Sequence, residues 1–502
     1  MVEVSLPGGW IKTVVGDYLY LKNGFAFKSN NYVSASACSF PVIRISDLDG
    51  QSATDLNAVH VEEGVGGFEV KNGDLLIAMS GATTGKIGVY QGGEPAYQNQ
   101  RVGNLKLHSE IYGCQQYKNH LISALGDQIL KIAYGGAQPN ISAKAIEEIE
   151  IILPPLAEQK VIADKLDTLL AQVETTKARL ERIPDILKTF RQSVLAAAVS
   201  GKLTEDWRAE NQFPNNVLRD IRDEKESWAK KNPEHNETNR VLKRVNSSLS
   251  VVNSKDVRLP EMWSWSQLED SVLMIVDCHN KTAPYTKEGN PLIRTSNIRD
   301  GKFIWDNLRF VSDETYEYWS RRCPPEPGDI IFTREAPMGE AAIIPPKQKL
   351  CLGQRTMLIR PVEKYISAKF LLIALMDPNF RKRSEGLAVG TGVKHYRVGD
   401  VSNLELAIPS TEEQTQIIHR VEELFAFADS IEQKANAALA RVNQLTQSIL
   451  AKAFRGELTA DWRAANPELI SGDNSAEALL AKIQAEREAL KPAKKTRAKK
   501  RA

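Results

Sequence analysis

Mostly apolar residues recur at alternating steps of four and three along two segments of this chain. The first series is Ile162, Leu166, Leu169, Val173, Thr176, Leu180, Ile183, Leu187, Phe190 and Val194. The second series is Ile417, Val421, Leu424, Ala428, Ile431, Ala435, Ala438, Val442, Leu445 and Ile449. This spacing is typical of a heptad seam along a long α-helix. Prolines precede both series, and Gly201 and Gly456 follow them, which predicts where the helices begin and end.

Each seam can be buried against the core of its own domain or against the other seam. A seam that is one residue wide at each step suits a partner helix better than a globular core. We therefore expect the two helices to pair as an antiparallel coiled coil, with Ile183 near Ala428. Pro184 lies inside the first series and predicts a kink or a break in that helix.

The two seams belong to an internal repeat. The stretch "LPPLAEQKVIADKLDTLLAQV" from Leu153 aligns with "IPSTEEQTQIIHRVEELFAFA" from Ile408, and the same register continues into "GKLTEDWRAEN" (201–211) and "GELTADWRAAN" (456–466). Upstream the similarity continues with insertions and deletions, for example "PVIRIS" at 41–46 with "PLIRTS" at 291–296. Two copies of one unit therefore follow each other, each with a mixed region and then a helical region of fixed length.

The mixed regions predict modules of the α/β (α+β) class. Short runs rich in β-branched residues, such as "GDLLIAM" at 73–79 and "GDIIFT" at 328–333, are bounded by glycine, proline and asparagine as strands are. A helix is expected near Phe370. The predicted division is 1–152 first module, 153–211 central helical spacer, 212–258 helix and polar linker, 259–407 second module, 408–466 distal helical spacer, and 467–502 C-terminal helix with a basic, disordered tail.

Composition places the chain among ordinary globular proteins, with 42% hydrophobic and 25% charged residues. No apolar run approaches the ~20 residues of a membrane-spanning helix, and no signal region opens the chain. Five cysteines without a CxxC pair argue against a disulfide framework or a structural zinc site, so we expect a cytoplasmic protein. The net charge of +2 favours no particular class of partner.

The sequence contains no complete catalytic motif. "GATTGKIG" at 81–88 lacks the spacing and the Ser or Thr of a phosphate-binding loop. "DPNF" at 377–380 lacks the second proline of the motif with which amino-methyltransferases hold a base, and is better explained as the end of a helix. Cys278 and His279 have no third group to orient them, and the seven histidines show no metal spacing. We expect no catalytic residue, no metal site and no cofactor in this chain.

The helical signatures carry a family resemblance. "LPPLAEQKVIADKLDTLLAQV", "FRQSVLAAAVSGKLTEDWR" and "LTQSILAKAFRGELTADWR" resemble those of the specificity subunit (HsdS) of type I restriction-modification enzymes, in particular the enterobacterial IA group. The resemblance covers the whole chain and is loose in the modules.

The resemblance implies that each module is a target-recognition domain that reads one half of a split site on double-stranded DNA. It further implies that two modification (HsdM) subunits methylate adenine and that two restriction (HsdR) subunits complete the nuclease. S-adenosylmethionine and ATP with magnesium would then be held by those partners, and no membrane is involved.

Neither module is strongly basic, since residues 1–152 hold 11 Lys+Arg against 15 Asp+Glu and residues 259–407 hold 20 against 19. Contacts with phosphates and bases must therefore come from local clusters. The candidates are Thr83, Thr84, Lys86, Gln138, Asn140 and Ser142 in the first module, and Arg334, Glu335, Arg381, Lys382, Arg383, Lys394, His395 and Arg397 in the second.

Four arginines recur in both copies, Arg44 with Arg294 and Arg101 with Arg355, and are interpreted as structural or phosphate-facing. Trp207, Arg208, Trp462 and Arg463 of the "LTxDWR" segments are candidates for binding partner subunits, because aromatic and arginine anchors often dominate interfaces. The alternative from another class is a coiled-coil scaffold or adaptor without DNA readout of its own.

Overall fold

The computed structural model describes residues 6–135, 139–249, 252, 258–390 and 394–490. The chain divides into two compact units. The first unit consists of Met1–Glu181 and Ala437–Ala502, and the second unit of Arg182–Asn436. The predicted basic tail lies outside the described residues.

The first unit is built on two sheets and a strand pair. Its strands are β1 (Ile11–Val14), β2 (Leu19–Asn23), β3 (Phe40–Ile43), β4 (Ser52–Ala53), β5 (Val59–Val61), β6 (Glu69–Val70), β7 (Leu75–Ala78), β8 (Ile87–Tyr90), β9 (Ala96–Gln98), β10 (Val102–Leu107) and β11 (Glu150–Leu153). The strand orders are β2-β10-β7-β8-β4 in one sheet and β5-β3-β9-β6 in the other, and β1 pairs with β11. The pair formed by β3 and β9 is parallel, and β1 runs antiparallel to β11.

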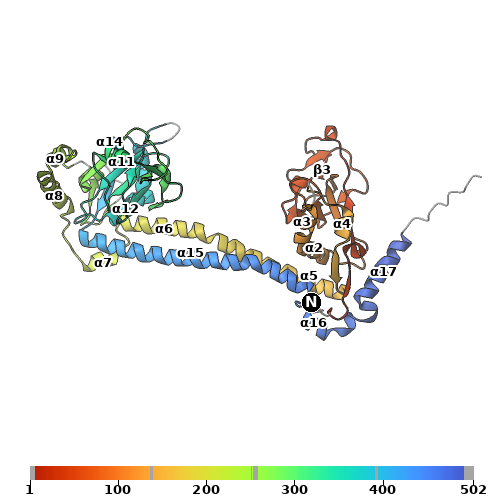
Figure 1. Ribbon diagram of the computed structural model, residues 1–502. Coiled ribbons are helices and arrows are strands. Elements are labelled where there is room, and N and C mark those ends of the chain that lie inside the picture. The colour runs from red at the N-terminus through yellow and green to blue at the C-terminus, as the bar shows by residue number, and fades with distance from the viewer. Residues whose placement is uncertain (1–5, 136–138, 250–251, 253–257, 391–393, 491–502) are drawn as a thin grey trace, which may run out of the picture. The chain divides into compact units, whose positions relative to one another are not determined.

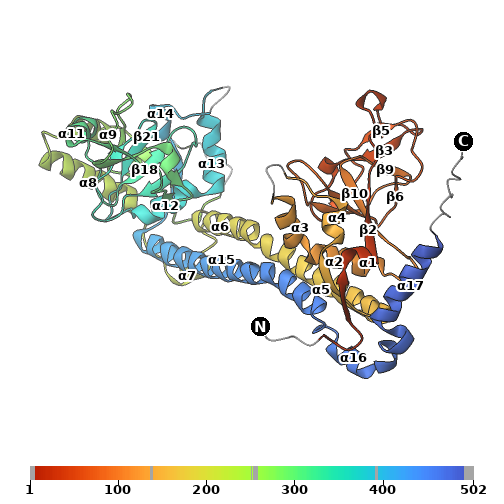
Figure 2. The ribbon, with the colours of Figure 1, turned by 45° about the vertical axis from the view of Figure 1, so that its right-hand side comes forward.

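Helices cover the first unit and extend from it. They are α1 (Val15–Tyr18), α2 (Gln115–Ala124), α3 (Gly126–Ala133), α4 (Ala143–Glu147), α5 (Leu156–Glu181), α16 (Ala460–Ala465), α17 (Ala476–Ala489) and the end of α15 (Thr411–Phe454). Figure 2 shows α2 between the sheets and α5. Leu166 of α5, Leu450 of α15 and Leu479 of α17 share one buried core with strand residues such as Leu75.

The second unit repeats this design. Its strands are β12 (Ser264–Gln267), β13 (Met274–Asp277), β14 (Asn290–Ile293), β15 (Ile298–Arg299), β16 (Lys302–Phe303), β17 (Arg309–Val311), β18 (Ile330–Thr333), β19 (Ala341–Ile343), β20 (Cys351–Leu352), β21 (Thr356–Arg360) and β22 (Glu405–Ile408). The strand orders are β13-β21-β18-β19 and β17-β14-β20, with β12 paired to β22. In the smaller sheet, β14 runs parallel to β20, as β3 runs parallel to β9 in the first unit.

The helices of the second unit are α6 (Ile183–Val199), α7 (Glu205–Glu210), α8 (Val217–Lys231), α9 (Thr238–Val245), α10 (Leu268–Ser271), α11 (Asp313–Ser320), α12 (Ala368–Met376), α13 (Pro378–Ser384), α14 (Val398–Ser402) and α15 as far as Asn436. The segment predicted as a polar linker from Asn232 contains α9. This helix packs on the module, because Arg244 binds Asp270 and Val241 is buried.

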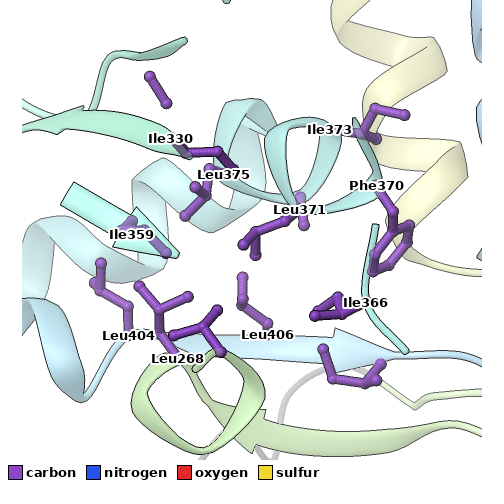
Figure 3. Packing of buried hydrophobic residues seen from close by; sticks show 14 of the residues in the cluster. Leu268, Ile330, Ile359, Ile366, Phe370, Leu371, Ile373, Leu375, Leu404 and Leu406 are labelled. Atoms are coloured by element: carbon purple, nitrogen blue, oxygen red, sulfur yellow. The ribbon is translucent and has the colours of Figure 1, made fainter. Parts of the chain in front are cut away.

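The helix predicted near Phe370 is α12. It supplies the centre of the second unit's hydrophobic core. Its residues Leu371 and Leu375 lie against Ile330 and Ile359 of the sheet, with Leu406 of β22 close by (Figure 3). The helix ends at Met376, and the carboxylate of the following Asp377 caps the next helix by accepting a bond from the Phe380 N–H at 2.8 Å. The helix-end explanation of "DPNF" is therefore confirmed.

The predicted break at Pro184 is confirmed, since α5 ends at Glu181 and α6 begins at Ile183 with the proline in its first turn. In the second unit α6 and α15 run side by side and antiparallel (Figure 1), because Arg191 binds Asp429 at 2.7 Å and Glu432 at 2.8 Å while Arg420 binds the Leu203 carbonyl. The two interpretations of the seam both apply. Val194 and Ile417 belong to the core that includes the module.

The predicted register of the helix pair is wrong. If Ile183 faced Ala428, Arg191 would face Arg420, whereas Arg191 reaches Asp429 and Glu432. The helices are thus shifted by roughly nine to twelve residues, about 14–18 Å along the axis. The apolar seam alone is compatible with several registers of the helix pair. The ion pairs beside the seam distinguish between these registers.

A buried carboxylate at the start of each long helix joins three chain segments, and we call each set a carboxylate junction. In the first unit Glu158 is fully buried and accepts bonds from the Trp10 indole at 2.8 Å, from the Thr459 hydroxyl at 2.6 Å and from Arg463. In the second unit the corresponding partners of Glu413 are Trp263 at 2.8 Å, Thr204 at 2.7 Å and Arg208 at 2.5 Å.

The junctions show that the compact units are not the sequential repeats. Glu158 and Trp10 come from the first copy, but Thr459 and Arg463 come from the end of the second copy. Each unit therefore combines the module and helix start of one copy with the helix end of the other.

We expect Glu413→Gln to lower the free energy of unfolding by about 3–5 kcal/mol, because it leaves the Arg208 guanidinium partly buried without a counter-charge. Glu412→Gln, at the exposed neighbouring position, should change it by less than about 0.5 kcal/mol. Urea unfolding followed by far-ultraviolet circular dichroism measures both. Equal effects of the two substitutions would show that the junction does not stabilise the unit.

Candidate nucleic-acid interface

In the first unit two of the predicted DNA-contacting loops meet. The loop after β7 carries Thr83, Thr84 and Lys86, and the loop after α3 carries Asn140 and Ser142. They are joined by a bond from the Ile141 N–H to the Met79 carbonyl at 2.9 Å and by a bridge between Ser80 and Asn140. Two segments more than 50 residues apart in the sequence thus form one surface.

Some side chains on this surface bind other parts of the protein, and others are open to solvent. Thr84 is 2% exposed, and its hydroxyl donates to the carbonyls of Gly81 and Pro139, so this side chain holds the two loops together. Ser142 caps α4 by accepting a bond from the Ala145 N–H. Lys86 and Asn140 are exposed, and Thr83 is half-buried. Gln138 lies outside the described residues.

The second unit has the same arrangement. The loop after β18 holds Arg334 and Glu335, and it meets the loop that holds His395. The Tyr396 N–H donates to the Arg334 carbonyl at 3.1 Å, Arg334 donates from Nη1 to the Tyr396 carbonyl at 3.1 Å, and Glu335 forms a bridge with His395. The loops thus occupy the same place in both units, after equivalent strands.

Three of the predicted cations in this unit make intramolecular contacts. Arg381 pairs with Glu340 at 3.0 Å, and Arg334 pairs with Asp277 at 3.4 Å, where burial raises the pKa of the Asp277 carboxyl. The Arg383 guanidinium lies 5.4 Å from the centroid of the Trp265 ring, and burial lowers its pKa.

Three of the predicted cations are exposed, namely Lys382 on α13 and Lys394 and Arg397 beside His395. Lys394 Nζ lies 3.9 Å from the Glu385 carboxylate, and both side chains are exposed. Exposed cations on glycine-containing loops can approach a phosphate backbone, while hydroxyls and amides can read base edges. This surface is therefore suited to a duplex.

A polar hollow beside these loops was not predicted from the sequence. It has a volume of about 290 Å³ and is lined by Thr282, Tyr285, Arg294, Ser296, Gln354 and Arg355, among others. It adjoins the loop after β18, because the Thr295 hydroxyl donates to the Ala336 carbonyl and Arg355 pairs with Glu335 at 3.0 Å. The recurrence of Gln354-Arg355 in both copies was the available signal, but no sequence pattern indicated a concave surface there.

The motifs rejected as catalytic occupy structural positions. "GATTGKIG" forms the turn between β7 and β8, with Gly81 and Gly85 at φ values of +88° and +86°, and a strand rather than a helix follows it. Burial raises the pKa of the Cys278 thiol, which disfavours the thiolate that a nucleophile needs. The centroid of the neighbouring His279 ring lies 4.5 Å from the centroid of the Trp319 ring.

The predicted partner-binding residues divide into two kinds. Arg208 and Arg463 belong to the carboxylate junctions and donate to the carbonyls of Gly201 and Gly456. Trp207 and Trp462 are half-buried, and the Trp207 ring stacks on Phe213 with 5.8 Å between the ring centroids. The tryptophans thus retain exposed surface that a partner could contact, whereas the arginines do not depend on a partner for their bonds.

A family model described as the type I restriction modification DNA specificity domain matches residues 7–185 and 271–441. It thus covers the module and the start of the long helix in each copy. The chain belongs to this family of specificity subunits.

Individual relatives agree with this assignment over nearly the full length. The chain is 37% identical to the EcoBI specificity subunit of Escherichia coli, over 97% of this chain and 94% of that protein. It is 34% identical to the EcoKI specificity subunit of Escherichia coli strain K12, over 97% of both, and 32% identical to the StySPI specificity subunit of Salmonella potsdam, over 99% of both.

Solved structures share the fold. The HsdS subunit from Thermoanaerobacter tengcongensis matches with a TM-score of 0.55 at 16% identity, covering 91% of this chain and 99% of that one. A chain from a structure concerned with assembly and conformational transition of the type I system matches with a TM-score of 0.60 at 17% identity, covering 90% of this chain and 99% of that one. Among the helices of the described residues, none has both the length and the apolar character needed to cross a membrane.

We expect the combined substitution Lys394→Gln and Arg397→Gln to weaken duplex binding, and to reduce the slope of log affinity against log salt by up to about 2 if each cation neutralises one phosphate. The measurement is fluorescence anisotropy over a salt series. Lys231→Gln, an exposed substitution on α8, is the control and should leave the slope unchanged. An identical slope for the double variant and the control would remove this loop from the DNA interface.

Proposed function

We propose that this chain reads a bipartite DNA site for a type I restriction-modification complex in the cytoplasm, with one unit on each half-site. The observation that carries the proposal is the same pair of joined loops in both units, with different side chains. The first unit presents Lys86 and Asn140 there, and the second presents Lys394 and Arg397. One chain with two unlike copies can read two unlike half-sites, as a symmetric dimer reads two like ones.

In this proposal the chemistry belongs to partner subunits. Two modification subunits use S-adenosylmethionine to methylate adenine in each half-site, and two restriction subunits use ATP with magnesium. The chain itself contributes recognition and spacing. An adaptor without DNA readout lacks support, because both copies match a DNA specificity domain.

The long helices would set the distance between the half-sites and carry the partners. Their length is kept between the two copies while the modules have changed by insertion and deletion. This pattern fits a division of labour in which helices fix geometry and modules choose sequence.

We expect an exchange of residues 1–152 for the corresponding region of a relative to change one half-site and to preserve the other. Mapping methylated adenines in a host genome, with and without the gene and with the exchanged gene, gives both half-sites and the spacer. The unexchanged chain and an empty host are the controls. A change in both half-sites would contradict the assignment of one module to one half-site.

We expect Trp207→Ala combined with Trp462→Ala to weaken binding of the modification subunit at least tenfold while leaving the methylated sequence unchanged, because aromatic anchors often supply much of an interface. Affinity is measured by titration of the folded chain with modification subunit. Trp305→Ala, at a 44% exposed tryptophan of the second module, is the control. If the double variant loses thermal stability but binds normally when folded, the tryptophans only pack against their own chain.

A further inference from the structure

The arginine that follows an inner strand of the smaller sheet makes the same hydrogen bonds with the backbone in both units. Arg44 follows β3 and Arg294 follows β14. Each donates from Nη2 to a carbonyl thirteen residues on, Arg44 to Asn57 at 2.9 Å and Arg294 to Asn307 at 3.1 Å. Each also donates its backbone N–H to the side chain three residues later.

The two arginines differ in charge compensation. The residue three positions on is Asp47 in the first unit, and its carboxylate lies 3.4 Å from Nε of Arg44. In the second unit the same position is Asn297, which carries no charge. Among the described residues Arg294 has no ion pair, and its buried Nε has no hydrogen-bond partner. The second unit thus holds an uncompensated guanidinium where the first unit holds a neutralised one.

This guanidinium lines the polar hollow of the second unit. Arg355, on the same hollow, is exposed and shares its charge with one carboxylate, that of Glu335 at 3.0 Å. Ser296 is exposed on the rim and offers a hydroxyl donor. Two guanidinium groups and a hydroxyl around a concave surface match the oxygens and the charge of a phosphate.

We propose that this hollow binds a phosphodiester of the DNA backbone, and that the corresponding position of the first unit does not. The inference rests on the proposed function and adds to it a contact that carries no sequence information. A phosphate contact fixes the register of a protein on the duplex without reading a base. Because Asp47 neutralises Arg44, the two units hold the backbone unequally.

The test compares the twin substitutions Arg294→Gln and Arg44→Gln in the full chain, copurified with its modification subunits. Binding to a duplex that contains the mapped target and to an unrelated duplex is measured over a salt series. Arg294→Gln should weaken both and reduce the salt slope by about 0.9, the value for one phosphate, while Arg44→Gln leaves the slope unchanged. Arg294→Lys, which keeps the charge, should retain the slope. Melting curves establish that each variant is folded.

The outcomes separate this inference from the function on which it rests. Equal slopes for the two twin variants, or a loss with Arg294→Lys as large as with Arg294→Gln, would overturn the phosphate site and leave sequence-specific binding in place. Absence of salt-dependent duplex binding by the unsubstituted complex would overturn both.

Discussion

A buried carboxylate has to be paired, and this requirement organises the chain. A single ionised carboxylate in a protein interior costs several kcal/mol unless charges and donors surround it. Glu158 and Glu413 are almost completely buried, and each is surrounded by an indole, a hydroxyl and a guanidinium from segments distant in sequence. Satisfying one carboxylate therefore brings a module, a helix start and the end of the other helix to one place.

The glutamine that follows each of these residues extends the constraint into the module. Gln159 accepts a bond from the Tyr18 hydroxyl at 2.7 Å and donates to the Pro154 carbonyl. Gln414 accepts from the Ser367 N–H and donates to the Tyr365 carbonyl. The first turn of each long helix is thus fixed to its own sheet domain on one side and to the other repeat on the opposite side. Because the start of each helical region meets the end of the other, the two regions have to match in length for both junctions to form.

Elements whose sequence has a clear period were predictable, and contacts between distant segments were not. The seams, the break at Pro184, the strands of 73–79 and 328–333 and the helix at Phe370 all followed from local spacing and turn residues. The helix α9 was read as linker because its segment is polar, and its burial comes from packing on the module. The interleaving of the two copies was not predicted. An alignment of the repeats shows which positions correspond, but it does not show which residues contact Glu158 in the folded chain.

The candidate site was predictable as loops but not as side chains. Glycines after buried strands indicated where the loops lie. The type of a residue does not reveal whether its side chain points to solvent or to a neighbouring loop. Thr84 and Arg334 have the polarity of DNA-contacting residues, and the structure uses both to join one loop to another. The hollow beside Arg294 is formed by three segments distant in the sequence, around Thr282, Ser296 and Gln354, and their meeting is visible only in the folded chain.

The interleaved units have a consequence for the order in which the chain completes its fold during synthesis. The second unit is one continuous stretch, so all its parts are present once residue 436 has emerged. The first unit begins earlier but lacks Thr459 and Arg463 until the end of the second helical region has been synthesised, which leaves the Glu158 carboxylate without its counter-charge. Domains usually complete from the N-terminus onward. Here the first module is synthesised first, but its carboxylate junction is complete only after the second copy has been made.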